Sequence, residues 1–240
     1  MTFRISSIRS RCRRGVLHSL GLLAALTAAA SAVGGTNDSA AAGGPAGAVT
    51  LRYAAFLAGA PVGEAAVSVT VADGRYQVEG DARSNGWLKG FTRWRNRFAA
   101  QGQVDGPHRE PAEFSYTETD SDKERHLIVR DGTMQVTKNG RRRPPRPAPA
   151  GPDVISALFV QPHCGNDQVL HTGRHVYRLT RLQQNPAGCR YEVTDDDGDT
   201  FEVELELGSR EGLVVPEKIT AYAWVTGWVE LTDAEARSAE

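Results

Sequence analysis

The chain has 240 residues, 40% of them hydrophobic, and its 28 Lys and Arg against 29 Asp and Glu give a formal net charge of −1 at pH 7. This length suffices for one domain with a buried core. Beyond the N-terminal segment, no apolar stretch of the sequence approaches the length that spans a membrane.

The N-terminal segment has the three parts of a secretory signal peptide. An apolar run over residues 16–30 leads to Ala30-Ser31-Ala32, which fits an A-x-A cleavage site, and it is preceded by a basic stretch without acids that contains Arg4, Arg9, Arg11, Arg13 and Arg14. We expect residues 1–32 to be removed and residues 33–48 to be flexible. The Arg13-Arg14 pair leaves twin-arginine export open beside the general secretory (Sec) route. The sequence therefore predicts a periplasmic protein.

Removal of this segment changes the charge balance of the chain. Loss of its five arginines leaves 23 Lys and Arg against 29 Asp and Glu, a net charge near −6. An exported chain with this excess of acid is a poor candidate for a general nucleic-acid-binding protein. We expect no nucleic-acid partner and no transmembrane segment.

Alternation of apolar and polar residues with a period of two predicts strands from residue 51 onward. The first two strands are expected over residues 51–56 and 65–71. Asp73-Gly74 then predicts a hairpin turn into a strand over residues 75–82, because Gly tolerates the positive φ of tight turns. The same pattern recurs around Asp131-Gly132, between strands over residues 127–130 and 133–138.

The C-terminal part repeats this pattern. Strands over residues 190–194 and 200–207 flank an acidic turn, and two more are expected over residues 214–224 and 228–231, joined at Thr226-Gly227. Between the two parts lies an Arg- and Pro-rich linker over residues 141–152, which cannot enter the interior of a sheet. The linker leads into a helix around residues 152–160, where Ile155, Leu158 and Phe159 have helical spacing.

These elements predict a mainly β fold. We expect one domain over residues 49–232, built as a single curved antiparallel sheet (a half-barrel or spiral-like meander) with one short inserted helix, and a C-terminal tail over residues 233–240.

Two cysteines, Cys164 and Cys189, remain after loss of Cys12 with the signal segment. An even pair in an oxidising compartment predicts a disulfide, worth roughly 3–3.5 kcal/mol in the chain-entropy model. The alternative is a metal site that combines Cys164 with three nearby histidines, His163, His171 and His175. Since Thr172-Gly173 reads as a turn between the last two, we expect no metal site and no cofactor.

Two groups of residues are candidates for ligand binding. Arg93, Arg95 and Arg97 share one strand face and could bind an anion, and the alternative is that they form ion pairs with acids across the sheet. Trp87, Phe91, Ile155, Leu158 and Phe159 could line an apolar groove on the concave face, if the helix covers only part of it. The alternative is that these apolar side chains only complete the core.

No catalytic motif stands out in the sequence. His126 lies in a strand pattern, His108 in a Gly-Pro turn, and Ser156 is an ordinary small residue on the expected helix. We therefore expect a protein that is not an enzyme and has no catalytic residues.

An ordered set of short motifs resembles an uncharacterised bacterial envelope family, DUF3108. The motifs are residues 51–56, Gly59-Ala60-Pro61-Val62-Gly63-Glu64-Ala65, Arg75-Tyr76, Gly86-Trp87-Leu88, Pro111-Ala112-Glu113-Phe114, residues 153–159, Val215-Pro216-Glu217-Lys218-Ile219 and Gly227-Trp228-Val229-Glu230-Leu231. The likeness spans nearly all of residues 49–232. It implies an envelope location and a curved sheet around a helix, similar by fold analogy only to lipoprotein carriers of the LolA/LolB type. It implies no catalytic residues.

The sequence predicts an exported, non-enzymatic envelope protein whose concave face holds a lipid-like or peptide ligand. Two alternatives remain open at this point. One is a protein–protein scaffold with an envelope protein partner, which would use an exposed sheet edge or the Arg- and Pro-rich linker. The other is a hydrolase of envelope glycans or peptides, which would require convergent polar groups in a cleft.

Overall fold

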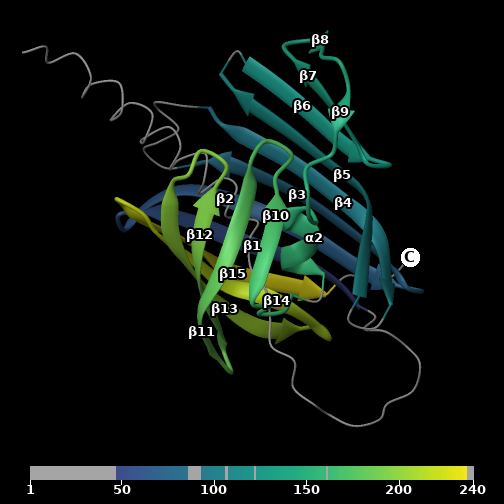
Figure 1. Ribbon diagram of the computed structural model, residues 1–240. Helices are drawn as coiled ribbons and strands as arrows, with labels where there is room; N and C mark the ends of the chain where they lie inside the picture. The colour runs from purple at the N-terminus through teal and green to yellow at the C-terminus, as the bar shows by residue number, and fades with distance from the viewer. Residues whose placement is uncertain (1–46, 86–92, 106–107, 122, 161, 237–240) are drawn as a thin grey trace, which may run out of the picture.

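A computed structural model describes residues 47–85, 93–105, 108–121, 123–160 and 162–236. In these residues one large antiparallel sheet accompanies a single short helix, as the sequence predicts (Figure 1). The predicted domain limits at residues 49 and 232, and the flexible segment and tail outside them, stay predictions.

The N-terminal part of the chain, which here includes the Arg- and Pro-rich linker, forms nine strands in the described residues. They are β1 (Gly47–Leu57), β2 (Ala60–Ala72), β3 (Arg75–Ser84), β4 (Arg95–Asp105), β5 (His108–Asp120), β6 (Lys123–Arg130), β7 (Thr133–Lys138), β8 (Arg141–Arg142) and β9 (Arg146–Pro147). Those of the C-terminal part follow helix α2 (Val154–Phe159) and are β10 (Asp167–His171), β11 (Val176–Asn185), β12 (Gly188–Asp195), β13 (Thr200–Arg210), β14 (Leu213–Tyr222) and β15 (Thr226–Ala236).

Along the main path of the sheet, strands that are neighbours are also consecutive in the sequence, except at the centre of the sheet, where β15 lies beside β1. The order is β10-β11-β12-β13-β14-β15-β1-β2-β3-β4-β5-β6-β7-β8, with β9 also paired to β7. Hence the first strand pairs with the last, from Val49 opposite Ala236 to Leu57 opposite Gly227. The sheet is not closed, because β10 and the β8–β9 segment form its two ends.

Tight turns occur where the sequence predicts them, with one correction. Asp73-Gly74 has φ of 51° and 70°, and Asp131-Gly132 has 50° and 67°, so both residues of each turn adopt the left-handed region that such hairpins require. The predicted join at Thr226-Gly227 is wrong, since both residues belong to β15 and the turn lies at residues 223–225. The β-branched threonine and the glycine pair with Tyr222 and Ala221 in the ladder instead.

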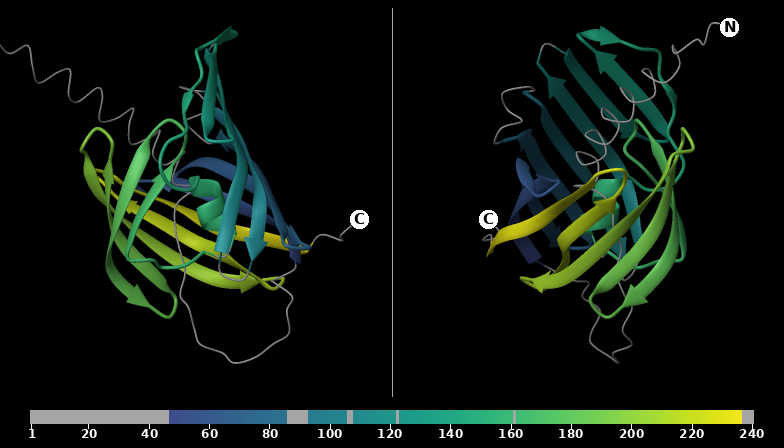
Figure 2. Two further views of the ribbon diagram at one scale, coloured as in Figure 1. Left: turned by 45° about the vertical axis from the view of Figure 1, so that its right-hand side comes forward. Right: turned by 90° about the vertical axis from the view of Figure 1, so that its left-hand side faces the viewer.

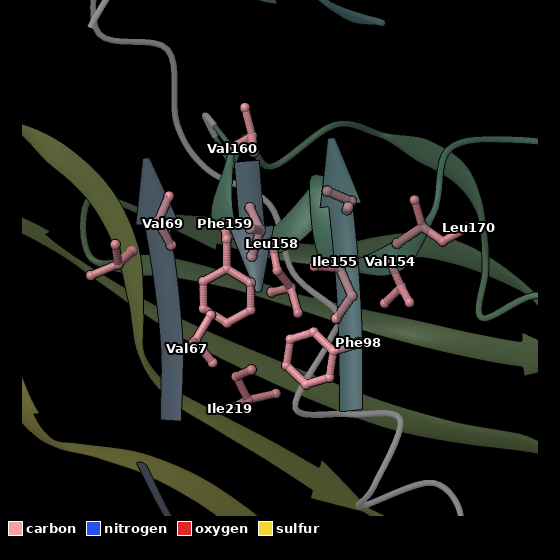
Figure 3. Packing of buried hydrophobic residues seen from close by; sticks show 14 of the residues in the cluster. Val67, Val69, Phe98, Val154, Ile155, Leu158, Phe159, Val160, Leu170 and Ile219 are labelled. Atoms are coloured by element: carbon pink, nitrogen blue, oxygen red, sulfur yellow. The ribbon is translucent and has the colours of Figure 1, made fainter. Parts of the chain in front are cut away.

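Helix α2 lies in the concavity between the two halves of the sheet (Figure 2). All six of its residues are buried. Leu158 and Phe159 face Val67 of β2, Phe98 of β4 and Ile219 of β14, so residues from both halves of the chain meet at the helix (Figure 3). Burial of each large apolar side chain of this kind stabilises the fold by about 1.5–3 kcal/mol. The core therefore depends on the helix to fill the concave face.

The Arg- and Pro-rich linker follows its predicted course. It does not enter the sheet interior but forms the short outer segments β8 and β9 beside β7, where a proline does not interrupt a ladder on both sides. Within the described part of the chain, no helix has the length and hydropathy needed to cross a membrane.

Candidate functional site

A cavity of about 1150 Å³ lies where the end of helix α2, the linker and the ends of several strands meet. Its apolar wall comes from both halves of the chain and includes Val71, Phe114, Val129, Phe159, Leu213 and Val214. Val214 is 42% exposed, whereas Phe159 is buried, so the wall extends from the surface to the core. A cavity of this size, mostly apolar with a few polar groups, is typical of small-molecule sites.

Two arginines border the cavity, and they bind the carbonyl oxygens of Val160 and Cys164. Arg109 donates from Nη1 to the Val160 carbonyl at 2.7 Å, and its Nη2 lies 3.4 Å from His163 Nδ1. Arg181 donates to the Cys164 carbonyl. Burial lowers the pKa of the Arg109 guanidinium, and the nearby Tyr76 and Asp153 partly offset this effect. These two guanidinium groups place positive charge beside Val160 and Cys164, while Glu113, Asp131 and Asp153 also line the cavity.

The predicted disulfide between Cys164 and Cys189 is confirmed, and it holds this same segment. The two Cα atoms lie 6.0 Å apart, and Cys189 belongs to β12. Cys164 also borders the cavity. The disulfide therefore ties the cation-bearing wall of the cavity to the C-terminal half of the sheet.

A buried polar chain stands at the start of helix α2. Asp153 accepts from the Ser156 backbone N–H at 2.8 Å and from the Ser156 hydroxyl at 2.7 Å, which makes it the N-cap of the helix. Since the Ser156 hydrogen goes to Asp153, the Tyr76 hydroxyl must donate to Ser156 Oγ, 2.9 Å away. Gly102 leaves room for the Tyr76 ring, because a Cβ there would lie 2.7 Å from the Tyr76 hydroxyl.

Burial raises the pKa of Asp153, and the two hydrogen bonds from Ser156 oppose this shift. Asp153 is 1% exposed and Ser156 is fully buried. The Ser156 hydroxyl therefore completes the cap and joins the helix to β3 through Tyr76.

His171 lies at the end of β10, next to this cap. Its backbone N–H donates to the Pro152 carbonyl at 3.1 Å, and its Nδ1 accepts from the Gly173 backbone N–H at 3.1 Å. The ring also meets Phe114 edge-on, with centroids 6.0 Å apart. Burial lowers the pKa of His171 to about 4, so the ring is neutral at pH 7 with its proton on Nε2.

The apolar residues that the sequence predicts as ligand-binding do not form one site among the described residues. Trp87 and Phe91 lie outside the described residues. Ile155 and Leu158 are 3% and 0% exposed in the core, and only Phe159 of the three helix residues also lines the cavity. The binding role of these residues stays a prediction.

The three arginine candidates are exposed, and Arg95 and Arg97 lie on the outer face of β4. Arg95 donates from Nε to Asp81 Oδ2 at 2.6 Å, and Arg97 lies 3.4 Å from the same carboxylate oxygen. Arg93 precedes β4 without a regular partner strand. Two of the three arginines therefore share one acid on β3, and anion binding by this face stays a prediction.

The residues considered for a metal site, Cys164 and the nearby histidines, have separate partners. His175 Nδ1 lies 2.9 Å from Asp196 Oδ1, His171 is bound to Gly173, and Cys164 is in the disulfide. Among the residues that the structure describes, no group of three or more His, Cys, Asp or Glu could hold a metal ion.

Several residues of this region escape sequence reasoning. Arg109 and Arg181 lie in ordinary strand patterns, and nothing local marks them as neighbours of one segment. Asp153 carries a usable signal, because an Asp directly before an apolar helical run predicts an N-cap. Tyr76 carries none, because its partner Ser156 is 80 residues away in the sequence.

Residues 50–160 match the family described as "Protein of unknown function (DUF3108)", which confirms the family resemblance over this part of the chain. Among curated proteins no significant match is found. One similar solved structure is the "Crystal Structure of Beta-barrel-like Protein of Domain of Unknown Function DUF1849 from Brucella abortus". It is 11% identical with a TM-score of 0.49, and the alignment covers 80% of this chain and 99% of that one. The analogy to LolA/LolB-type carriers stays a prediction.

Proposed function

We propose that this protein is an exported, non-enzymatic envelope protein that binds an amphiphile with an anionic head group in the cavity described above. The ligand class is a fatty acid or a phospholipid with its acyl chain against the apolar wall. The observation that carries the proposal is the combination of a cavity of about 1150 Å³, apolar walls and two guanidinium groups beside one segment.

The division of the cavity supports this ligand class. Phe114, Phe159 and Leu213 offer hydrophobic contact without hydrogen-bonding groups, which suits an acyl chain. Arg181 forms no ion pair with a carboxylate among the described residues, and its fork of N–H donors matches a carboxylate or phosphate. A peptide ligand would require backbone donors and acceptors along the apolar wall, which these side chains do not provide.

The test is native mass spectrometry of the protein purified from its own periplasm, followed by solvent extraction and lipid analysis. We expect a stoichiometric adduct of lipid mass and a chain that begins at Val33. Val214→Glu places a charge on the exposed part of the cavity wall and is expected to abolish the adduct. Leu182→Glu is the matched control, because Leu182 is 52% exposed on β11 and does not line the cavity.

The positive end of the cavity is tested separately. Arg181→Gln removes the charge and is expected to weaken binding of a soluble fatty acid by about tenfold, the range of one charged hydrogen bond. The proposal is rejected if the purified protein carries no lipid and also fails to bind oleate in titration calorimetry. An adduct of equal abundance in the Val214→Glu and Leu182→Glu variants would likewise place the ligand elsewhere.

A further inference from the structure

One end of the sheet carries positive charge without compensating acid. Lys138, Arg141, Arg142, Arg143 and Arg146, here called the basic edge, are all exposed. The sequence has no Asp or Glu between Asp131 and Asp153. Five of the 28 Lys and Arg of the chain thus stand within nine consecutive residues.

The fold presents these residues together. β8 pairs with the end of β7, Arg142 opposite Thr137 and Arg141 opposite Lys138, and β9 pairs with its beginning. The segment that contains β8 and β9 therefore runs along β7 as the outermost part of the sheet, and it projects beyond the rest of the molecule (Figure 1). The Gln135 amide donates to the Arg143 carbonyl at 2.6 Å and fixes the backbone between the two short strands.

The side chains of the basic edge form no ion pair with any acid in the described part of the chain. Several exposed arginines elsewhere do so: Arg83 binds Glu64, Arg95 binds Asp81 and Arg174 binds Glu118. Charge alone protects a sheet end against pairing with another chain, but either sign serves that purpose. A single sign over five residues indicates a partner of opposite charge.

The chemistry of the basic edge narrows the partner. Pro144, Pro145 and Pro147 remove backbone donors, so a partner chain cannot extend the sheet here. The sequence from Arg130 to Pro152 contains no aromatic residue on which a nucleic-acid base could stack. What remains is a dense row of cations, which fits a surface of closely spaced phosphate groups.

The basic edge also adjoins the cavity. Ala148, Pro149 and Gly151, which directly follow β9, line its wall together with Arg130 and Gly132 at the β6–β7 turn. Contact of the basic edge with a surface would therefore bring the cavity close to that surface.

We infer that the basic edge docks the protein on a bilayer rich in anionic phospholipid, and so places the cavity where it can take up or deliver its ligand. The docking step stands on the charge and placement of the basic edge, and the transfer step rests on the proposed function. Since only electrostatic contact is involved, docking is reversible and weakens with salt.

The experiment is co-sedimentation with vesicles of phosphatidylcholine alone and of phosphatidylcholine with 40 mol% phosphatidylglycerol. We expect binding only to the anionic vesicles, with loss at high salt. The variant Arg141→Glu/Arg142→Glu/Arg143→Glu keeps a charged sheet end and is expected to lower the partition coefficient by about a hundredfold, given the contribution of each basic residue near such a surface.

The matched control is Arg52→Glu/Arg75→Glu/Arg178→Glu, which changes the net charge equally at exposed positions elsewhere. We expect it to bind within about fivefold of the unchanged protein, and Arg141→Lys/Arg142→Lys/Arg143→Lys to bind as the unchanged protein does. All proteins are purified in the same way and share one N-terminus, so any contribution of residues 1–46 is equal. Circular dichroism and thermal unfolding verify that each variant folds.

Equal loss in the edge variant and in the control would overturn the inference, as would binding to both kinds of vesicle. Tighter binding of a labelled single-stranded DNA than of anionic vesicles, abolished in the edge variant, would assign the basic edge to nucleic acid instead. Oleate binding without vesicles, measured in the same variants, separates the two proposals: its retention with loss of vesicle binding supports docking alone, and its absence rejects the cavity ligand without affecting docking.

Discussion

Polar groups lie in two contrasting regions of this molecule. Beside helix α2, Asp153, Ser156 and His171 are at most 4% exposed, and each has at least one hydrogen-bond partner. On the outer face, the exposed Arg95 and Arg97 share the half-buried Asp81. Loss of a partner is costly in the first region, because the remaining group stays buried, and cheap in the second, where water replaces it. Stability therefore depends on the region that is inconspicuous in the sequence.

The largest expected effect is the acid sensitivity of the buried region. The pKa of His171 in the folded protein is about 4, below the usual 6.5. Between these two pH values the unfolded chain binds a proton that the folded protein does not, so the free energy of unfolding falls as the pH falls through this window. The total loss is about 3 kcal/mol.

Urea unfolding at a series of pH values from 7.5 to 3.5 measures this effect. His171→Gln removes the titrating ring and is expected to flatten the curve between pH 6.5 and 4. An unchanged slope in His171→Gln would mean that other groups cause the acid sensitivity.

The next effect concerns the helix cap. Asp153→Ala removes the acceptor of two hydrogen bonds and leaves the Ser156 hydroxyl buried without it, so we expect a loss of about 2 kcal/mol in the free energy of unfolding at pH 7. Asp153→Asn is expected to cost less than half as much, because its amide oxygen still accepts from Ser156 and no charge is buried. Equal losses in the two variants would show that the carboxylate itself is needed.

The smallest effect on stability is expected on the outer face. Asp81→Asn removes the shared acid and is expected to lower the free energy of unfolding by less than about 1 kcal/mol. It also leaves Arg95 and Arg97 uncompensated, as in the basic edge, so we expect anionic-vesicle binding to rise about fivefold. Glu79→Gln, at an exposed residue of β3, is the control for net charge. Vesicle binding that does not rise would show that position along the sheet matters more than uncompensated charge.

Local parts of the fold follow from the sequence. Asp73-Gly74 and Asp131-Gly132 determine their hairpins because both residues of each pair accept positive φ. Helix α2 was expected over residues 152–160, and its observed limits are Asp153 as N-cap and Val160 as C-cap. These predictions succeed because their cause lies within a few residues.

Long-range features could not be predicted in this way. β5 carries Pro111, and its residues from Ser115 to Asp120 are polar apart from Tyr116, so no clear alternation of apolar and polar residues marks it. The pairing of β1 with β15 has no local signal, and neither have the contacts of Arg109 with Val160 and of Arg181 with Cys164. The cavity depends on such meetings, so the sequence indicates a concave face but not where it is open.

Pairing of the first strand with the last has a consequence for how the chain acquires its fold. A chain that emerges with its N-terminus first can form the hairpins from β1 to β7 early. The side of β1 that does not pair with β2 remains an unpaired edge until β15 emerges, about 180 residues later. Contacts of such sequence separation slow folding and prolong exposure of a template for aggregation. The chain would thus be most vulnerable to aggregation just before its last strand appears, and this is the interval in which a chaperone would be most useful.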